Sequence, residues 1–284
     1  MDGQQTQPGI AFEIEGHVAT LTITQERRLN AMTLGMWEAL PRLLRRADET
    51  PGVRVVVLRG SGDRAFCAGA DISEFATLRS SPADVEHYEE AVQAALTALR
   101  EHPTPTVAAI RGICFGGGLE LALSCDLRLA EEGSRFRMPG AVLGLGYAYE
   151  GVALVAQRIG PDNAADILYT AREVAASEAR AMGFVNRLAD AGAFDAALAE
   201  LAGSIARNAP LTHRATKRAL LELSRAPEPR DREMVERAVA ACFASADYAE
   251  GRRAFAERRI PDFRADAEAA RKSFNDPLGD EVSP

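Results

Sequence analysis

The chain has 284 residues, of which 47% are hydrophobic, and its formal net charge is −8. This length is enough for one large buried core, and the acidic balance excludes an overall basic footprint for nucleic acid. The sequence contains no run of about 18 apolar residues, so we expect no membrane-spanning helix. The four cysteines have no CxxC or zinc-like spacing, which favours reduced thiols, no bound metal and a cytoplasmic protein. The first ten residues have neither a basic nor an apolar region, so we expect no signal peptide.

Hydrophobic periodicity predicts alternating strands and helices over the first two thirds of the chain. Strand-like runs occur at 18–25, 53–60, 104–112, 126–130 and 184–189. Helical spacing occurs at 34–48, 83–100, 119–125, 151–159, 161–169, 177–182 and 192–207. Pro41 is expected to disturb the first of these helices. From residue 212 onward the pattern is almost entirely helical, with a break at 225–230. We therefore predict an α/β core over residues 1–205 and a helical region over 206–284.

Two short turns rich in Gly and Ala each follow a predicted strand and lead toward a helix. They read AFCAGADISEF (65–75) and RGICFGGGLE (111–120). Small residues let a ligand approach the backbone, and N–H groups at a helix start point outward with the positive end of the helix dipole behind them. Two such turns facing each other would form an oxyanion hole, with the N–H groups of Ala70 and Gly117 as donors. Tight strand-to-helix packing is the alternative explanation for each turn alone. Cys67 and Cys114 flank the turns without a neighbouring base, so we expect small buried residues there.

Together these turns resemble those of the crotonase superfamily, the enoyl-CoA hydratase/isomerase family. The resemblance runs roughly from residue 10 to 264 and includes LNAMT (29–33), SRFRMP (134–139) and NAPLTHRATKRAL (208–220). It implies a crotonase-like spiral of ββα units, followed by a C-terminal helical region that covers CoA and forms homotrimers or hexamers. It also implies an acyl-CoA thioester substrate whose carbonyl oxygen sits between the N–H groups of Ala70 and Gly117. Coenzyme A is then part of the substrate, and no separate cofactor is expected.

The resemblance also implies two glutamates that flank the C2–C3 double bond of the substrate and handle one water molecule. The first corresponds to Glu120, for which a capping carboxylate in the first helical turn is the alternative. The second corresponds to Gly140, so this carboxylate is missing. The following loop, LGLGYAYEGV (143–152), adds three polar side chains, those of Tyr147, Tyr149 and Glu150. Glu150 is either a replacement acid or a charge at a helix N-terminus. The two tyrosines either donate a hydrogen bond or form a wall of the pocket.

Further residues are expected at the substrate from their positions in the resemblance. Those nearest the thioester are Ala68, Gly69, Asp71, Ile72, Gly116, Gly140, Tyr147 and Tyr149, and Asp71 is also expected to hold its loop. Arg28 and Lys217 are candidate partners of the CoA phosphates, although such residues are more often solvated surface charges. Phe263 ends the region that approaches the adenine in relatives.

The sequence therefore predicts an acyl-CoA-processing enzyme, foremost an enoyl-CoA hydratase with one of the two usual glutamates. An enoyl-CoA isomerase or a C–C hydrolase or lyase of the same family is the nearest alternative. A CoA-binding member without catalytic activity is the alternative from another class.

Overall fold

The structure, a computed structural model, describes residues 9–74, 81–225 and 230–263. Its strands form two sheets, of six and four strands. The larger sheet has the order β1 (Ile10–Glu15), β2 (Val18–Ile23), β3 (Val55–Gly60), β5 (Thr106–Ile110), β7 (Leu127–Glu131), β10 (Arg187–Ala189). The smaller sheet has the order β4 (Ala65–Cys67), β6 (Ile113–Phe115), β8 (Arg135–Arg137), β9 (Val174–Ala175).

From β3 to β8, consecutive strands alternate between the two sheets. The chain passes from β3 to β4, from β5 to β6 and from β7 to β8, and the equivalent strands pair in parallel within each sheet. After each such pair the chain returns through helical structure, including α3 (Pro82–Glu101) after β4 and α4 (Gly117–Ser124) after β6. This repetition is a spiral of ββα turns, and it confirms the predicted architecture.

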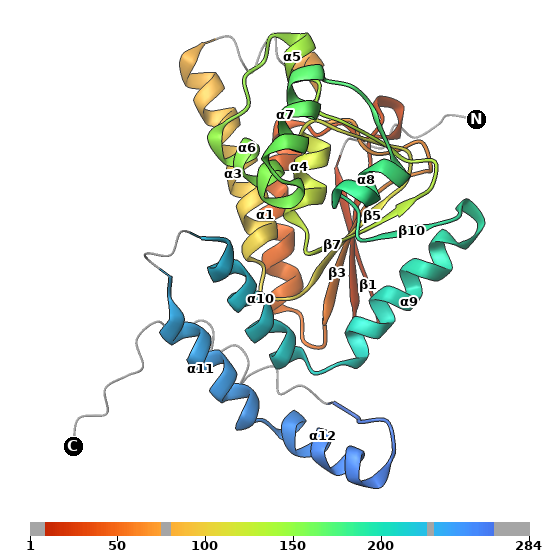
Figure 1. The fold of residues 1–284 in the computed structure, drawn as a ribbon, viewed down its shortest axis with the longest axis vertical. Helices are drawn as coiled ribbons and strands as arrows, with labels where there is room; N and C mark the ends of the chain where they lie inside the picture. Colours follow the sequence, from red (N-terminus) through yellow and green to blue (C-terminus); the bar gives the residue numbers. More distant parts are fainter. Residues whose placement is uncertain (1–8, 75–80, 226–229, 264–284) are drawn as a thin grey trace, which may run out of the picture.

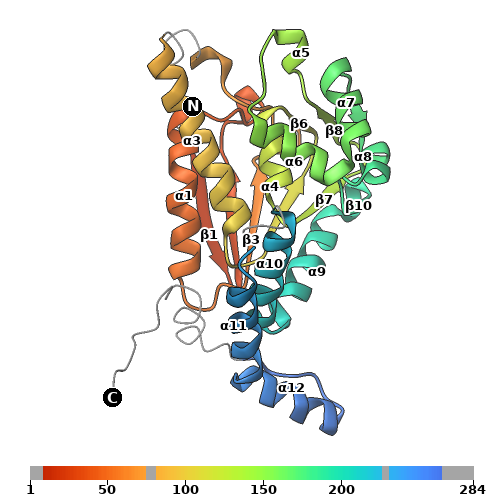
Figure 2. The ribbon, with the colours of Figure 1, turned by 60° about the vertical axis from the view of Figure 1, so that its left-hand side comes forward.

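The central strands β3 and β5 of the larger sheet are buried on both faces. On β3, Val56 and Leu58 belong to the main core, whereas Val55 and Val57 join a second cluster with Phe194 of α9 (Phe194–Arg207). Helices α1 (Leu34–Glu49) and α3 pack side by side over the main core, and α9 lies across the opposite face (Figures 1 and 2). A strand with two buried faces needs apolar residues at every position, which accounts for the continuous VVVL run.

The remaining helices between the sheets and the C-terminal region are short. They are α5 (Gly140–Leu143), α6 (Tyr149–Ile159), α7 (Pro161–Thr170) and α8 (Ala176–Met182). Helices α10 (Pro210–Ser224), α11 (Arg232–Phe243) and α12 (Ala246–Glu257) follow, and α11 and α12 extend beyond the end of the sheets in both views (Figures 1 and 2). The predicted boundary at 205 falls in the last turn of α9, and most of the predicted break at 225–230 lies outside the described residues. No helix in the described ranges is long and apolar enough to cross a membrane.

The expectation that Pro41 disturbs the first helix is wrong, because α1 continues through it to Glu49. Proline removes one backbone hydrogen bond from a helix interior. In α1 the apolar face carrying Met36, Trp37, Leu40 and Leu44 is buried, and this packing holds the helix together across the lost bond.

Candidate active site

The turn after β4 is fixed by backbone hydrogen bonds to residues 29–32. The Ala68 amide donates to the Leu29 carbonyl at 3.0 Å, and the Asp71 amide donates to the Met32 carbonyl at 2.8 Å. The Met32 amide in turn donates to the Gly69 carbonyl at 2.7 Å. Gly69 has a φ of +104°, a left-handed conformation that favours glycine. The Ala70 amide lies within this clamped turn and has no acceptor in the described part of the chain.

The turn after β6 leads directly into α4. Gly116 precedes the helix with a φ of 51° and a ψ of −124°, and its amide donates to the Arg137 carbonyl at 2.8 Å. The Gly117 amide is the first of the helix, where no intrahelical acceptor exists, and it finds none elsewhere among residues 9–74, 81–225 and 230–263. A Cβ atom at residue 118 would lie 2.2 Å from the Cys67 carbonyl oxygen, so a larger residue there would separate the two turns. The glycines therefore bring both turns into contact.

The two free amides meet at a cavity of about 130 Å³. A Cβ atom at Gly117 would lie 3.8 Å from the Ala70 nitrogen, so the donors come from adjacent pieces of backbone. The lining includes most of the residues that the sequence predicts for the site, namely Ala68, Gly69, Ala70, Ile72, Gly116, Gly117, Glu120, Gly140 and Tyr147. Such an arrangement can bind one oxygen atom that becomes negatively charged.

Glu120 lies on the first turn of α4, next to these amides. Its side chain lines the cavity, the residue is 9% exposed, and its carboxylate has no hydrogen-bond partner within the described residues. Burial, and to a smaller extent the negative charge of Glu89 on α3, raise the pKa of Glu120 to about 7. A carboxyl group with this pKa can both accept and donate a proton near neutral pH.

Tyr147 fills the space in front of Gly140, where the resemblance implies a second glutamate. The Gly140 amide donates a 2.8 Å hydrogen bond to the Tyr147 hydroxyl oxygen. A Cβ atom at residue 140 would lie 2.5 Å from Cε2 of the Tyr147 ring and 2.8 Å from the Leu145 carbonyl oxygen. Any side chain at this position would have to displace the ring, so glycine and tyrosine form a matched pair.

Asp71 anchors the first turn rather than lining the cavity. Its carboxylate accepts hydrogen bonds from the Ser73 amide at 3.0 Å and from the Arg28 guanidinium at 2.8 Å. Burial would raise the pKa of Asp71, but the hydrogen bonds from Ser73 and the charge of Arg28 outweigh it and lower that pKa. The Arg28 side chain is 53% exposed, so it places a positive charge close to the first turn.

Four other predicted site residues are not among those lining this cavity. Tyr149 and Glu150 lie on the first turn of α6 and are exposed. Lys217 on α10 forms a 2.6 Å ion pair with Asp126, and burial lowers its pKa. Phe263 packs against Gly251 of α12 and lines a different cavity.

The sequence prediction assigned no site role to several lining residues from α1 and α3, namely Trp37, Tyr88, Glu89, Val92 and Gln93. The helix α3 contributes two pairs separated by four residues, 88 with 92 and 89 with 93. This spacing places them on one side of the helix, a signal that the sequence does contain.

The cysteines beside the turns are buried thiols. Burial raises the pKa of Cys67 to about 12 and the pKa of Cys114 well above its ordinary value. Thiols with such pKa values are not nucleophiles at neutral pH. No cluster of three His, Cys, Asp or Glu side chains suited to a metal ion occurs in the described ranges.

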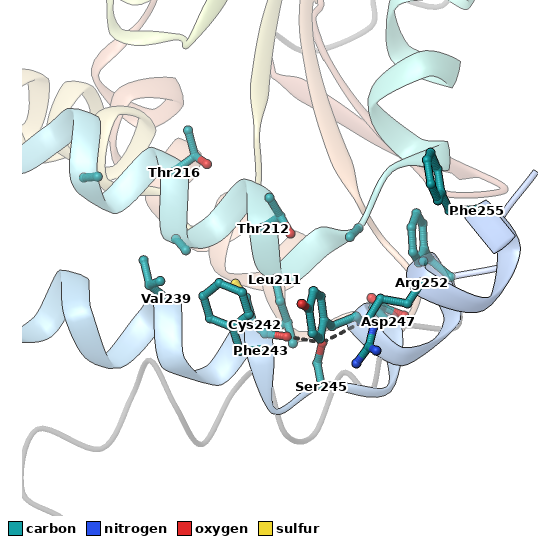
Figure 3. Close-up of a pocket in the computed structure, with 16 residues that line it drawn as sticks. Leu211, Thr212, Thr216, Val239, Cys242, Phe243, Ser245, Asp247, Arg252 and Phe255 are labelled. Atoms are coloured by element: carbon teal, nitrogen blue, oxygen red, sulfur yellow. Dashed lines mark hydrogen bonds between the residues drawn. The ribbon is translucent and has the colours of Figure 1, made fainter.

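A larger cavity of about 760 Å³ lies between α10, α11 and α12 (Figure 3). It shares no lining residue with the first cavity, and its walls are mainly apolar. The rings of Phe243 and Tyr248 meet edge to face in its wall, with centroids 5.2 Å apart. Phe243 and Phe255 are 62% and 87% exposed, which leaves a broad apolar surface on these helices.

Comparison with known proteins identifies the family of this chain. The family model described as enoyl-CoA hydratase/isomerase matches residues 13–266. A putative enoyl-CoA hydratase from Thermus thermophilus is 36% identical over 88% of this chain and 98% of its own. A crotonyl-CoA hydratase from Syntrophomonas wolfei is 30% identical, covering 89% of this chain and 97% of its own. The crystal structure of an enoyl-CoA hydratase/carnithine racemase from Magnetospirillum magneticum superposes with a TM-score of 0.86 at 37% identity, covering 91% of this chain and 96% of that one.

The chain therefore belongs to the enoyl-CoA hydratase/isomerase family of the crotonase superfamily. The family and the relatives together indicate an enzyme of the lyase or isomerase type with an enoyl-CoA hydratase-like function.

Proposed function

We propose that this protein adds water to the C2–C3 double bond of a 2-enoyl-CoA, with Ala70, Gly117 and Glu120 as the central groups. The observation that carries the proposal is the meeting of two unbonded backbone amides with an almost fully buried glutamate at one cavity. The fold alone would not distinguish among the reactions of the family, whereas these groups define the chemistry that the cavity can perform.

The two amides polarise the thioester carbonyl. When the water oxygen bonds to C3, the π electrons of the double bond move toward C2 and the carbonyl oxygen, which becomes an enolate oxygen. The Ala70 and Gly117 N–H groups donate hydrogen bonds to this oxygen inside the cavity. Loss of one donor from such a site typically costs about 10²- to 10³-fold in rate.

Glu120 handles the proton. Its carboxylate accepts one proton from the water molecule as the oxygen attacks C3. The resulting carboxylic acid then gives a proton to C2, and the enolate electrons return to that carbon. The product is a 3-hydroxyacyl-CoA, and Glu120 is again a carboxylate, so the cycle is balanced.

Arg28 is the proposed cation for the CoA portion of the substrate. It is half-exposed, it is joined to the first turn through Asp71, and a phosphate can bind its exposed face. The lining residues Ala68, Gly69, Ile72 and Gly116 would contact the thioester end. Lys217 and Phe263 are not among the residues of this chain that line the cavity.

The proposal is tested with crotonyl-CoA and a panel of longer and aromatic 2-enoyl-CoAs, following loss of the conjugated thioester absorbance and identifying the product by mass. The expected product is a 3-hydroxyacyl-CoA, and Glu120→Gln is expected to abolish turnover while it keeps acyl-CoA binding. Full activity in this variant would contradict the assignment of Glu120. Acyl-CoA binding without turnover of any substrate would identify a non-catalytic family member.

One specific observation supports isomerisation as a second candidate reaction. Glu120, a carboxyl group of raised pKa, lines the cavity together with the two amides. One base can move a proton between C4 and C2 of an enoyl-CoA without adding water. A 3-enoyl-CoA in the same panel distinguishes the two reactions, because isomerisation would create the conjugated absorbance rather than remove it.

We also propose that the protein forms a homotrimer or a dimer of trimers through its C-terminal helices. The exposed apolar residues of α11 and α12 around the larger cavity support this proposal (Figure 3). A cytoplasmic location is a further proposal, supported by the four free thiols.

A further inference from the structure

The Tyr147 hydroxyl has one hydrogen-bonding role fixed and another left open. Its oxygen accepts the hydrogen bond from the Gly140 amide, so the orientation of the phenol is set by backbone. Its own hydrogen has no acceptor among the described residues, although the ring lines the cavity. A held phenol with an unused O–H is a directional donor toward whatever occupies the cavity.

Three other polar side chains of the lining, those of Glu89, Tyr88 and Trp37, are less suited to this role. Glu89 acts on Glu120 as a negative charge, and an ionised carboxylate has no hydrogen to donate. The Tyr88 hydroxyl lies 3.5 Å from the Met32 carbonyl oxygen and is fully buried. The indole nitrogen of Trp37 is inaccessible to a water molecule. Gln93 is the other neutral donor, and it lies on α3.

We propose that Tyr147 positions the water molecule that Glu120 activates. This inference rests on the hydratase function proposed above and adds the second group that the water requires. The Tyr147 O–H donates to one lone pair of the water oxygen, and one water hydrogen is donated to the Glu120 carboxylate. The remaining lone pair of the water then faces C3 of the substrate. Tyr147 keeps its proton throughout, so the proton balance described for Glu120 is unchanged.

The electrostatics of Tyr147 and Glu120 are consistent with a neutral hydrogen-bond donor beside a base. Burial raises the pKa of Tyr147, the hydrogen bond from Gly140 opposes this effect, and the negative charge of Glu120 raises the pKa further. The phenol is therefore neutral at the pH where Glu120 is an effective base. Both groups line the same cavity, so the charge of Glu120 acts on the phenol.

Two reactions at the same site, hydration and C2 proton exchange, distinguish a water-positioning role of Tyr147 from other roles, because only hydration needs a positioned water molecule. Hydration of crotonyl-CoA needs the amides, Glu120 and a positioned water. Exchange of the C2 protons of butyryl-CoA in D₂O needs the amides and Glu120 alone. In the exchange, Glu120 removes a C2 proton, the electron pair moves to the thioester oxygen, and a deuteron returns to C2 after the carboxyl group exchanges with solvent.

The test compares both reactions in the wild-type protein and in Tyr147→Phe. Hydration is expected to fall about 10- to 100-fold, the range for loss of one strong hydrogen bond. The loss is expected in kcat rather than KM, and C2 exchange is expected to stay within about twofold. Tyr169→Phe is the matched control, since Tyr169 on α7 is 80% exposed and lies outside the cavity lining.

A second variant, Gly140→Ala, tests the same hydroxyl by changing the residue whose amide holds it. Gly140→Ala keeps the phenol but forces its ring to move, because of the 2.5 Å approach described above. It is expected to reduce hydration more than exchange, as Tyr147→Phe does.

Unchanged hydration in Tyr147→Phe would overturn the water-positioning role. So would a parallel loss of both reactions, or a selective loss of hydration in Gln93→Leu in place of Tyr147→Phe. Absence of hydration by the wild-type protein would overturn the proposed function and this inference with it.

Discussion

Gly151 on α6 provides the space that the Glu120 carboxylate occupies. A Cβ atom at residue 151 would lie 2.4 Å from Oε1 of Glu120, well inside contact distance. The helix after the tyrosine-bearing loop therefore shapes the position of the base, although no hydrogen bond joins the two residues.

Gly151→Ala is expected to push the Glu120 side chain out of place. Hydration should fall by at least about tenfold, because a small misplacement of a catalytic group costs one to two orders of magnitude. The helix itself should be preserved, since alanine favours helix by about 1 kcal/mol over glycine. Steady-state kinetics and circular dichroism check both points. Gly35→Ala is the control, because this helical glycine has no neighbour within 4 Å of a new Cβ atom. Equal hydration by both variants would contradict the packing argument.

The pH dependence of kcat/KM should show the ionisation of Glu120. Activity is expected to rise with pH through about 7 and then level off, since the base must be deprotonated. The other titratable residues that line the cavity with Glu120 are Glu89 and Tyr88 on α3 and Tyr147 in the loop. Glu89→Gln removes a charge that raises the pKa of Glu120, so the rise should move to lower pH. If the pH profile of kcat/KM were identical in Glu89→Gln and in the wild-type protein, the rise with pH would not be due to the ionisation of Glu120.

Glu120 should also make the folded state less stable at high pH. Its folded-state pKa of about 7 lies above its ordinary value of 4.5, so the folded protein binds the proton more tightly than the unfolded chain. This contribution to the free energy of unfolding is present at pH 4 and is lost as pH rises through 7. The pKa difference corresponds to about 3 kcal/mol. The stability of Glu120→Gln relative to wild type should therefore improve between pH 5 and pH 8, as measured by urea unfolding. A difference that does not change with pH would exclude the raised pKa.

Lys217 is expected to contribute to stability rather than to substrate binding. Its ammonium group donates to Asp126 at 2.6 Å and to the Thr104 carbonyl at 3.3 Å, and these bonds join α10 to the core. Lys217→Met should lower the free energy of unfolding by about 1 to 3 kcal/mol, because it removes a charge-assisted hydrogen bond. The KM for the acyl-CoA should not change. A higher KM with unaltered stability would instead support the prediction that Lys217 binds CoA phosphates.

The apolar surface of the C-terminal helices should control assembly. Phe255→Asp introduces a charge at an 87% exposed aromatic position next to the larger cavity, and it is expected to reduce the mass measured by light scattering. Tyr169→Asp, which alters an exposed aromatic residue on α7, serves as the control. A monomeric wild-type protein, or an unchanged mass in Phe255→Asp, would contradict the proposed interface.

The sequence allowed the long elements to be predicted because their patterns are long. The run at 53–60 predicts β3, and the helical spacing at 83–100 predicts α3 to within one residue at each end. The strands of the smaller sheet have two or three residues each, which is too short for any period to appear. Pro41 shows the reverse case, in which tertiary packing outweighs a strong local signal.

The site likewise has features that the local sequence predicts and features that depend on tertiary packing. The Gly and Ala turns carry the local signature of two amide donors, so Ala70 and Gly117 could be predicted from the residues themselves. Glu120 is predicted from the family resemblance, and all three residues line the cavity. The pairing of Gly140 with Tyr147 depends on how a loop folds back across seven residues, and the sequence offers no measure of that distance. The charge of Glu89 likewise reaches Glu120 only through the packing of α3 on α4.

The most direct test of the account concerns the two free amides. The carbonyl stretch of a ¹³C-labelled butyryl-CoA thioester is measured by isotope-edited infrared spectroscopy, free in buffer and bound to Glu120→Gln, where no turnover interferes. Hydrogen bonds from Ala70 and Gly117 should shift the bound carbonyl band to lower wavenumber. A bound thioester whose carbonyl band stays at the position seen in buffer would show that these amides do not form an oxyanion hole.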